Sequence, residues 1–487
     1  MRPLKIIIEK HDEYSINVNQ IKYAFHTLMT IAGYSYHFLP FDTTETVVDI
    51  YFGVKSPENV NYKLYIKMAV GKSIRDNNNY LFKIKNGINF LLSESENDNN
   101  FLSSDINGHL TKIENDIIFS SFYLLSGLQE RHIRRGKHDI HVVEDSFLFN
   151  DKLLHTPIIN QYGQLIRSIF QQSHSFLPSW PGNKQYAVAL SHDVDYPEMI
   201  RWIEAFRYLA KKGFDNKLEK FIDIMRGEES FWKFENWIEI EQNYDMKSAF
   251  YFCGYYGNLI QYFTKSPDPF YDVGTDKFKS IMRLIDNNGF EVGMHASYQT
   301  YLSPDQFREE KFIIEQSLAK PIYGNRHHYW HINHDNPGET AKIHNNIGLV
   351  YDSSIVFEQH SGFRYSICSP FHLFDRINNE ELITLQLPPT LMDDHLDGYA
   401  IKHGFDTYQS HLDSLLDSVR KYEGVFVSDY HVRGMNINFF PIWKESYEYL
   451  LNEINKRDDF YCDTPIKIAK YWLNREQVIL NRSIDER

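Results

Sequence analysis

The 487-residue chain has few cysteines. Its three cysteines, Cys253, Cys368 and Cys462, are far apart and odd in number. They form neither a CxxC zinc motif nor a disulfide framework, which would need closely spaced or paired thiols. This usage is typical of a reducing compartment.

Long apolar runs are also missing. The run nearest the N-terminus spans only Ile6 to Ile8, far short of the roughly 7–15 residues of a signal-peptide core. No stretch approaches the about 18 uninterrupted apolar residues of a membrane-spanning helix. We therefore expect a cytoplasmic protein without a membrane segment.

Basic residues are in deficit. Lys and Arg number 51 against 65 Asp and Glu, which gives a net charge of −14. An acidic chain has no global attraction to phosphate backbones or anionic lipid, so neither nucleic acid nor a membrane surface is an expected partner. The first part of the chain also lacks the phosphate-binding loops GxGxxG and GxxxxGK(S/T), which argues against nucleotide chemistry there.

Length and composition indicate a globular protein of two or three domains. Hydrophobic residues make up 42% and charged residues 24%, close to globular averages, and a domain takes roughly 150 residues. Residues 1–178 alternate strand-like and helical patterns, so we predict a smaller N-terminal α/β domain of unknown role. The polar segment 173–184, with two prolines and a glycine, predicts the boundary.

Residues 179–487 alternate strand-like and helical segments more regularly. Seven strand-like runs fall at 186–195, 247–254, 290–297, 321–329, 348–355, 382–389 and 424–431. Most are separated by stretches long enough for a helix, such as 278–289 and 307–320. Such units form a parallel sheet covered by helices. We therefore predict α/β class for the whole chain and a distorted (β/α) barrel of about seven strands for this region.

Titratable or donor side chains stand at the ends of five of these runs. They are Asp193 and Asp195, His295, Arg326 with His327 and His328, Asp352, and His431. The carboxyl ends of barrel strands meet and carry catalytic groups. Asp193 and Asp195 point the same way on an extended chain, and two adjacent carboxylates need a cation or a proton between them. Taken alone, each aspartate is explained equally well by a turn after the strand, and each histidine by an ordinary hydrogen bond. Five successive strand ends that carry such residues favour a functional site.

The ordered set resembles the polysaccharide deacetylase family, carbohydrate esterases with a distorted (β/α) barrel. Ser191–Asp195 (SHDVD) is similar to the motif TFDVD, and His295 matches the first histidine of H-(S/T)-x-x-H. Arg326–Tyr329 is similar to R-x-P-Y, and Asp352 and Val427–His431 take the places of the last two motifs.

The resemblance spans about residues 185–440. GFR at 362–364 and PPTLMDD at 388–394 are also similar to a bacterial subgroup with an uncharacterised N-terminal α/β domain before the barrel. FYLLSGLQE and PIINQYGQLI, earlier in the chain, resemble that domain.

The resemblance implies roles for the strand-end residues. Asp193 would be the general base, His431 the general acid, and Asp195 a metal ligand with His295. A base removes a proton from water and an acid donates one to the leaving amine. A divalent cation polarises the carbonyl and lowers the pKa of its water.

Three further residues complete the implied set. Arg326 would hold Asp193 ionised and oriented through a charge-assisted contact. The main-chain N–H of Tyr329 would stabilise the oxyanion together with the cation. Asp352 would belong to the catalytic set because it occupies the place of the aspartate in the fourth family motif.

The sequence leaves the third metal ligand open. Catalytic zinc takes three protein ligands and a water, but Gln299 stands where the family has its second histidine. His327 or His328, on the neighbouring strand, could complete the set, and so could the amide oxygen of Gln299. A site without a tightly bound metal is a further alternative.

Together these implications predict a hydrolase with a divalent metal, zinc by its ligand types, acting on a carbohydrate. It would remove an acetyl group from the amide nitrogen of an N-acetylated sugar or glycan. Two alternatives stay open, a catalytically silent carbohydrate-binding protein and a metal-dependent amidohydrolase with a non-sugar substrate. The N-terminal domain is expected to position substrate or partners and to carry no catalytic group.

Overall fold

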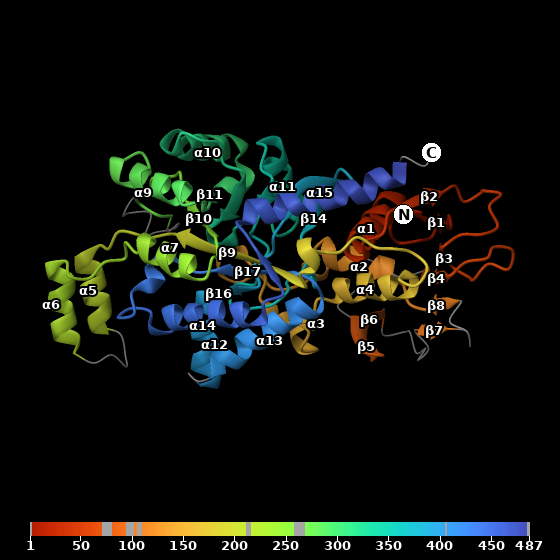
Figure 1. Ribbon diagram of the computed structural model, residues 1–487, viewed down its shortest axis with the longest axis horizontal. Coiled ribbons are helices and arrows are strands. Elements are labelled where there is room, and N and C mark those ends of the chain that lie inside the picture. Colours follow the sequence, from red (N-terminus) through yellow and green to blue (C-terminus); the bar gives the residue numbers. More distant parts are fainter. Residues whose placement is uncertain are drawn as a thin grey trace.

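The computed structural model describes residues 2–70, 80–93, 102–104, 110–210, 216–257, 268–404 and 407–484. Two sheets lie along the long axis of the molecule, and the chain passes through the first before it enters the second (Figure 1). Within the described residues, no helix has both the length and the hydropathy needed to cross a membrane.

In the described ranges, the first sheet has six strands and is parallel except at one edge. In spatial order they are β2 (Tyr36–Leu39), β1 (Leu4–Ile8), β3 (Ile50–Gly53), β4 (Leu64–Lys67), β8 (Thr111–Ile113) and β7 (Leu102–Ser104). Only β7 is antiparallel to its neighbour. The other elements of this part are the hairpin β5 (Tyr80–Lys85) and β6 (Ile88–Ser93), and the helices α1 (Val18–Ala32), α2 (Ile117–Leu125), α3 (Phe147–Asn150) and α4 (Ile158–Phe170).

Helix α1 shows how local sequence sets these elements. Asn17 and Gln20 form a reciprocal capping box at its start, which satisfies backbone N–H groups that have no partner inside the helix. Gly33 ends it with φ 82°, a conformation that a Cβ would strain. Apolar residues between these caps recur at helical spacing and are buried, so α1 lies against the first sheet and α4.

The second sheet carries the predicted barrel strands. Its spatial order is β14 (Phe371–Asp375), β15 (Glu380–Gln386), β13 (Tyr351–Asp352), β12 (Gly324–His327), β11 (Glu291–Ala296), β10 (Ser248–Phe252), β9 (Tyr186–Val194), β17 (Val425–Asp429) and β16 (Leu391–Met392), with β18 (Phe460–Cys462) also on β9. All nine residues of β9 are buried, as expected for a central parallel strand with both faces covered.

Helices surround this curled sheet. They are α5 (Arg201–Ala210), α6 (Lys217–Arg226), α7 (Phe234–Asn243), α9 (Asp276–Asn287), α10 (Pro304–Leu318), α11 (Pro337–Asn346), α12 (Asp393–His403), α13 (Tyr408–Lys421), α14 (Pro441–Arg457) and α15 (Pro465–Ile484). The two helices predicted at 278–289 and 307–320 correspond to α9 and α10.

The mixed α/β class is confirmed, and each of the seven predicted strand runs contains a strand. The count of about seven is too low, because the short strands β16 and β18 and the antiparallel β14 bring the described sheet to ten. Among the described strands, β15 and β16 do not pair with each other, so strand pairing does not close the barrel at this point. The segment between them crosses the gap instead: Leu387 N–H donates to Asp352 O (2.9 Å), and Thr390 N–H donates to Val427 O (2.8 Å).

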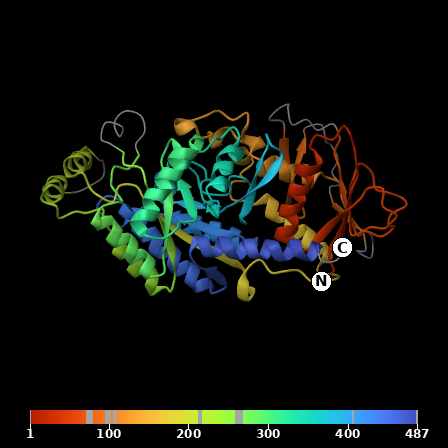
Figure 2. The same cartoon turned by 90° about the horizontal axis from the view of Figure 1, so that it is seen from above.

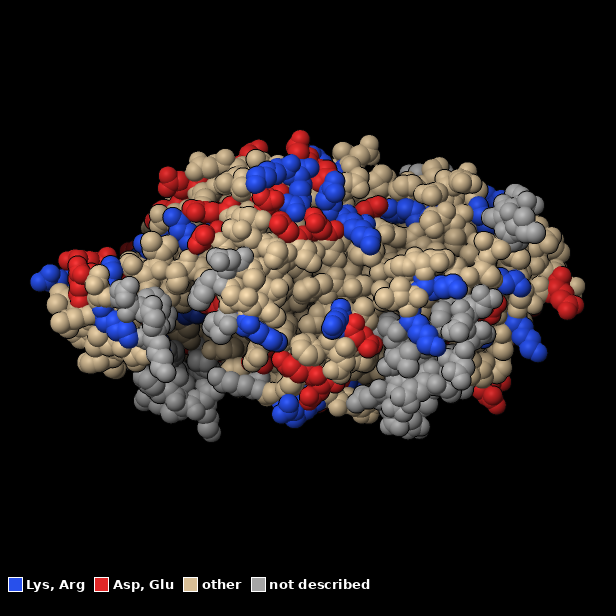
Figure 3. All heavy atoms as spheres, turned by 90° about the horizontal axis from the view of Figure 1, so that it is seen from below, with Lys and Arg blue, Asp and Glu red and all other residues tan. Residues whose placement is uncertain are grey.

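The two sheets share an apolar core. The cluster around the first sheet also contains Tyr365, Phe371 and Phe374 from the later part of the chain. The long helix α15 contacts both β9 and β2, and it runs from one sheet to the other (Figure 2). A division near residue 178 remains a prediction. On the face drawn in Figure 3, acidic and basic side chains are interspersed.

Candidate active site

The carboxylate expected to act as base lies at the end of β9 and is held by a buried arginine. Nη1 of Arg326 donates to Oδ1 of Asp193 (2.9 Å), and Nη2 donates to Ser191 Oγ (2.9 Å) and Ser353 Oγ (3.0 Å). Burial alone would raise the pKa of Asp193, but the charges of Arg326, His295 and His431 outweigh it and lower the pKa. Asp193 is therefore ionised and fixed in orientation.

The sequence prediction did not include the second carboxylate on this arginine. Asp429, at the end of β17, places Oδ1 2.9 Å from Arg326 Nη1, an ion-pair distance without hydrogen-bond geometry. Burial raises the pKa of Asp429 well above its usual value, and the charge of Arg326 only partly offsets this. Burial thus favours the neutral form of Asp429 more than that of Asp193, since one guanidinium cannot neutralise two buried carboxylates.

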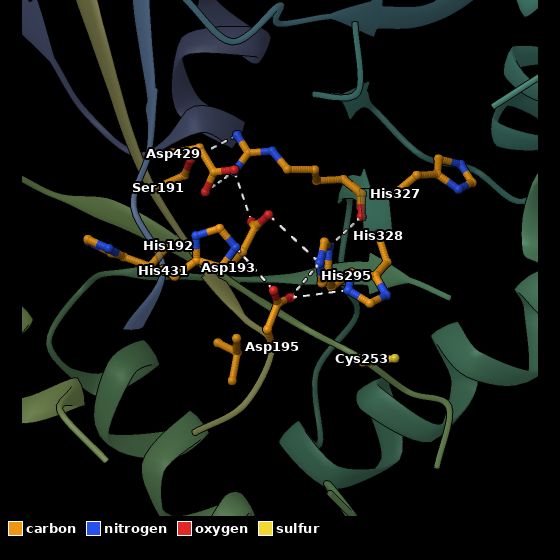
Figure 4. Close-up of polar contacts among 12 residues, drawn as sticks. Ser191, His192, Asp193, Asp195, Cys253, His295, His327, His328, Asp429 and His431 are labelled. Atoms are coloured by element: carbon orange, nitrogen blue, oxygen red, sulfur yellow. Dashed lines mark hydrogen bonds and ion pairs between the residues drawn. The ribbon is translucent and has the colours of Figure 1, made fainter. Parts of the chain in front are cut away.

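Asp195, His295 and His328 come together beside Asp193 (Figure 4). Asp195 Oδ1 lies 3.1 Å from His295 Nε2 and 3.7 Å from His328 Nε2. All three side chains are buried. Parallel pairing of β9, β10, β11 and β12 brings these residues together, since the strand ends meet at one edge.

Each histidine of this group has its other ring nitrogen occupied. Nδ1 of His295 lies 2.9 Å from the main-chain oxygen of Arg326, and Nδ1 of His328 lies 2.9 Å from Asp268 Oδ1. Because these acceptors cannot donate, each Nδ1 carries the proton when the ring is neutral. Both Nε2 atoms then present lone pairs towards Asp195. Such partners are typical of histidines that bind metal.

These residues fit a divalent cation. One carboxylate and two imidazoles form a common catalytic zinc set, and tetrahedral donors at about 2.0–2.1 Å from zinc lie about 3.3 Å apart. The two distances to Asp195 Oδ1 lie close to this value. Burial lowers the pKa of His295, but the charge of Asp193 and the hydrogen bond with Asp195 raise it to about 9. Protons therefore compete with a cation for this group.

A histidine–aspartate pair stands next to these three residues. Nδ1 of His431 lies 3.0 Å from Asp393 Oδ1, and Nε2 lies 3.1 Å from Asp195 Oδ2. The N–H of His431 also donates to Asp393 Oδ2 (2.7 Å). Burial would lower the pKa of His431, but the charges of Asp393 and Asp195 raise it well above its usual value. His431 is thus protonated near neutral pH, as a general acid must be.

Two of the three candidates for the third ligand position lie elsewhere. Gln299 is exposed on the turn after β11, in contrast to the buried trio. The ring of His327 points away from Asp195 (Figure 4), and its Nε2 lies 2.9 Å from Nε2 of His344 on α11. Side chains alternate along a strand, so His327 and Arg326 leave β12 in opposite directions. His328, one residue further, turns back to the site.

Asp352 also lies outside the trio, in the second group that contains His327 and His344. It accepts hydrogen bonds from Asn325 Nδ2 (2.7 Å) and Ser354 Oγ (2.8 Å) and holds the end of β13. Among the described contacts, Asp352 has none with Asp193 or His431 that would support its expected catalytic role.

This second group does not fit a metal. Among the described atoms, Nδ1 of His327 and Nδ1 of His344 have no hydrogen-bond partner. If both Nε2 atoms bound a cation, both buried Nδ1–H donors would be left unsatisfied, at about 1–3 kcal/mol each. A hydrogen bond from Nε2–H of one ring to Nε2 of the other leaves only one buried Nδ1–H donor unsatisfied. Burial also lowers both pKa values, which suits a neutral pair.

Tyr329, expected to supply an oxyanion N–H, stands in a turn with φ 54°. A segment from the first part of the chain covers this turn. The ring of His138 stacks on Tyr329 with centroids 4.1 Å apart, and Ile140 packs with Trp330, Val356 and Met392. The N-terminal part thus reaches the rim of the site, although it adds none of the titratable groups described above.

Three partners of the site were missed from the sequence: Asp268, Asp393 and Asp429. Asp429 ends a predicted strand two residues before His431, and Asp393 lies in the quoted stretch PPTLMDD, so strand-end position could have indicated both. Asp268 follows no strand or helix pattern.

Comparisons with known proteins find one family model and several distantly similar solved structures. Residues 11–175 match DUF7033, described as a family of unknown function. No curated protein matches the chain. Similar solved structures include a Mycobacterium smegmatis protein assigned to the polysaccharide deacetylases, at 16% identity and TM-score 0.39, over 62% of this chain and 96% of that one. PuuE allantoinase aligns at 14% identity and TM-score 0.40, over 62% and 95%. A CE4-family pseudoenzyme, solved as a mutant with restored activity, aligns at 12% identity and TM-score 0.28, over 60% and 69%.

Proposed function

We propose that this chain is a metal-dependent hydrolase that removes an acyl group, acetyl in the simplest case, from the amide nitrogen of an N-acylated sugar. The observation that carries the proposal is the trio Asp195, His295 and His328, flanked by an ionised carboxylate and a protonated imidazole. Amide hydrolysis needs these three functions in one place.

The residues support a division of work. Asp193, held by Arg326, accepts a proton from the attacking water, whose oxygen adds to the acyl carbon. The carbon–nitrogen bond then breaks, and Nε2–H of His431 donates the proton that the leaving amine needs. Asp393 orients His431 through Nδ1. A divalent cation held by the trio would polarise the carbonyl and lower the pKa of the water.

Two finer parts of the proposal, a sugar as the substrate and zinc as the metal, are supported by fewer observations. The motif order at 191–195, 295, 326–329 and 427–431 resembles polysaccharide deacetylases, and the His–His–Asp donor set is one that zinc prefers. We also propose that the chain is divided into residues 1–178 and 179–487. In the same way, we propose that it belongs to the bacterial subgroup whose sequence patterns it resembles.

Acetate release tests this function. The full-length chain, stripped with a chelator and reloaded with zinc, should release acetate from N-acetylglucosamine oligomers, and the stripped chain should not. Asp193→Asn should lower kcat about 10²–10⁴-fold, whereas Gln299→Ala, at an exposed position, should leave it unchanged.

The outcomes separate the alternatives. Hydrolysis of N-acetylated amines without hydrolysis of the sugars would favour an amidohydrolase with another substrate. Sugar binding without zinc binding and without acetate release would favour a silent carbohydrate-binding protein that has lost its metal. Equal turnover of Asp193→Asn and the wild-type chain would contradict the assigned base.

A further inference from the structure

A cavity of about 300 Å³ is lined partly by residues that closely follow the site residues in the chain. It opens between α5 and the turn that follows β17, and aromatic side chains form much of its wall, among them Tyr196, Tyr208, Phe231, Phe270 and Phe439. Its volume is at the lower end for ligand pockets and suits one group of about the size of a monosaccharide.

The walls of this cavity continue the strand ends that carry the site. Tyr196 directly follows Asp195, and Arg433 comes two residues after His431. Phe270, two residues after Asp268, contacts the ring of Tyr196 with centroids 5.9 Å apart. Two residues span at most about 7 Å of chain, so parts of the cavity wall begin within about 7 Å of the site along the backbone.

Most charged groups that line the cavity have partners. Glu198 pairs with Lys277 (2.6 Å), and Glu204 pairs with Arg207 (2.7 Å). Arg433 differs from them. In the described part of the chain, its guanidinium has no carboxylate within ion-pair distance, and its buried Nε has no acceptor.

Arg433 lies over aromatic rings and keeps its charge. Its guanidinium carbon is 5.3 Å from the ring centre of Tyr196 and 5.6 Å from that of Phe440. Burial would lower the pKa of Arg433, but the more distant carboxylates of Asp195 and Asp394 raise it above its usual value. The side chain of Arg433 is only partly buried and lines the cavity, so a ligand carboxylate there would supply the acceptor that its guanidinium lacks.

We propose that this cavity is a subsite for a carboxylate on the substrate, bound by Arg433 while the aromatic rings pack against the sugar. The proposal rests on the proposed function and narrows it to acidic N-acylated sugars. A guanidinium matches a carboxylate in shape and charge. A phosphate dianion fits less well, because Arg433 is the unpaired cation among the described lining residues and two glutamates stand beside it.

The test measures binding and not hydrolysis. A failure of the subsite proposal can therefore be distinguished from a failure of the proposed hydrolase function. Dissociation constants are measured by ligand-observed NMR titration of the full-length chain. The probes are N-acetylglucosamine and two acidic derivatives, one oxidised to a carboxylate at C6 and one with a lactyl carboxylate at O3. Inorganic phosphate and acetate are the competing anions.

At least one acidic probe should bind about tenfold more tightly than N-acetylglucosamine, the worth of one charge-assisted contact. Arg433→Gln should abolish this preference and leave the affinity for the neutral sugar unchanged. Arg207→Gln, which changes a paired arginine at the same cavity, should retain the preference. Thermal unfolding of each variant checks that it is folded.

Four results would overturn the proposal. They are equal affinities for the neutral and acidic probes in the wild-type chain, no measurable binding of any probe, a preference that survives Arg433→Gln, and displacement of the acidic sugar by phosphate at lower concentration than by acetate. An Arg433-dependent preference in a chain that releases no acetate would support the subsite and contradict the hydrolase.

Discussion

Nδ1 of His328 lies 2.9 Å from Oδ1 of Asp268, and both side chains are buried. This contact fixes the ring so that Nε2 faces Asp195 Oδ1 at 3.7 Å. A histidine at the position where the related motif has proline thus gains the orientation of a metal ligand. Asp268 matters to the site although it touches neither the base nor the acid in the described contacts.

Asp268→Asn should weaken zinc binding by about 10–100-fold, the usual effect of removing a hydrogen-bonded partner of a metal ligand. The neutral amide accepts a weaker hydrogen bond from His328 and supports its basicity less. Competition with a chromophoric chelator measures the affinity. Gln299→Ala is the control and should bind zinc within twofold of the wild-type chain; a loss as large as that of Asp268→Asn would contradict the ligand assignment.

Zinc affinity should depend on pH through His295. The pKa of this residue is raised to about 9, so below pH 9 the cation must displace a proton, and the apparent affinity should rise by up to about tenfold per pH unit between pH 6.5 and 9. Zinc titrations in buffers of different ionisation enthalpy measure the proton release. Affinity independent of pH over this range would show that His295 is already unprotonated.

The stability of the metal-free chain should change in the opposite direction. A folded-state pKa of about 9 against about 6.5 in the unfolded chain means that His295 stabilises the fold fully below pH 6.5. This contribution is lost as pH rises through 9. Urea unfolding of the chelator-treated chain at pH 6.5 and 9 should give a lower free energy of unfolding at the higher pH, and the His295→Gln variant should show less of this decrease.

Asp393→Asn should shift the alkaline limb of activity to lower pH. Burial favours neutral His431, and the charge of Asp393 is the largest influence that raises its pKa. Removing that charge lowers the pKa, so the protonated acid is lost at lower pH. The pH profile of kcat measures the shift, and Asp394→Asn, a neighbouring change without contact to His431 Nδ1, is the control. An unchanged alkaline limb would mean that another group is the acid.

The first part of the chain should be required for the stability of the whole. Glu130 accepts two hydrogen bonds from Arg364 (2.7 and 2.9 Å), and both residues are buried. Glu130→Gln leaves the guanidinium without its counter-charge and should cost about 3–5 kcal/mol of unfolding free energy. Arg134→Gln breaks an exposed pair with Asp145 and should cost at most about 1 kcal/mol. Equal effects in urea unfolding would contradict a structural role for this contact.

Strand positions and the main site residues could be predicted because both depend on local patterns. Buried parallel strands appear as continuous apolar runs, and Asp193, His295 and His431 follow three of them. The edge strand β14 and the short β16 were missed, since their pairing depends on segments far away in the chain.

The directions in which neighbouring side chains point could not be predicted from the sequence. His327 and His328 are equivalent as letters, and only the turn after β12 decides that the second faces Asp195 while the first meets His344. Asp268 lies in a segment without periodicity, so nothing in its pattern indicates a contact with His328. The distribution of charge over Asp193 and Asp429 depends on burial and on a shared arginine.

The central claim is that Asp195, His295 and His328 hold the catalytic cation. The most direct measurement is anomalous diffraction at the zinc edge from crystals of the full-length chain grown with zinc. One strong peak should lie within about 2.0–2.2 Å of Asp195 Oδ1, His295 Nε2 and His328 Nε2. A peak between His327 and His344, or no peak at the trio at saturating zinc, would contradict the claim.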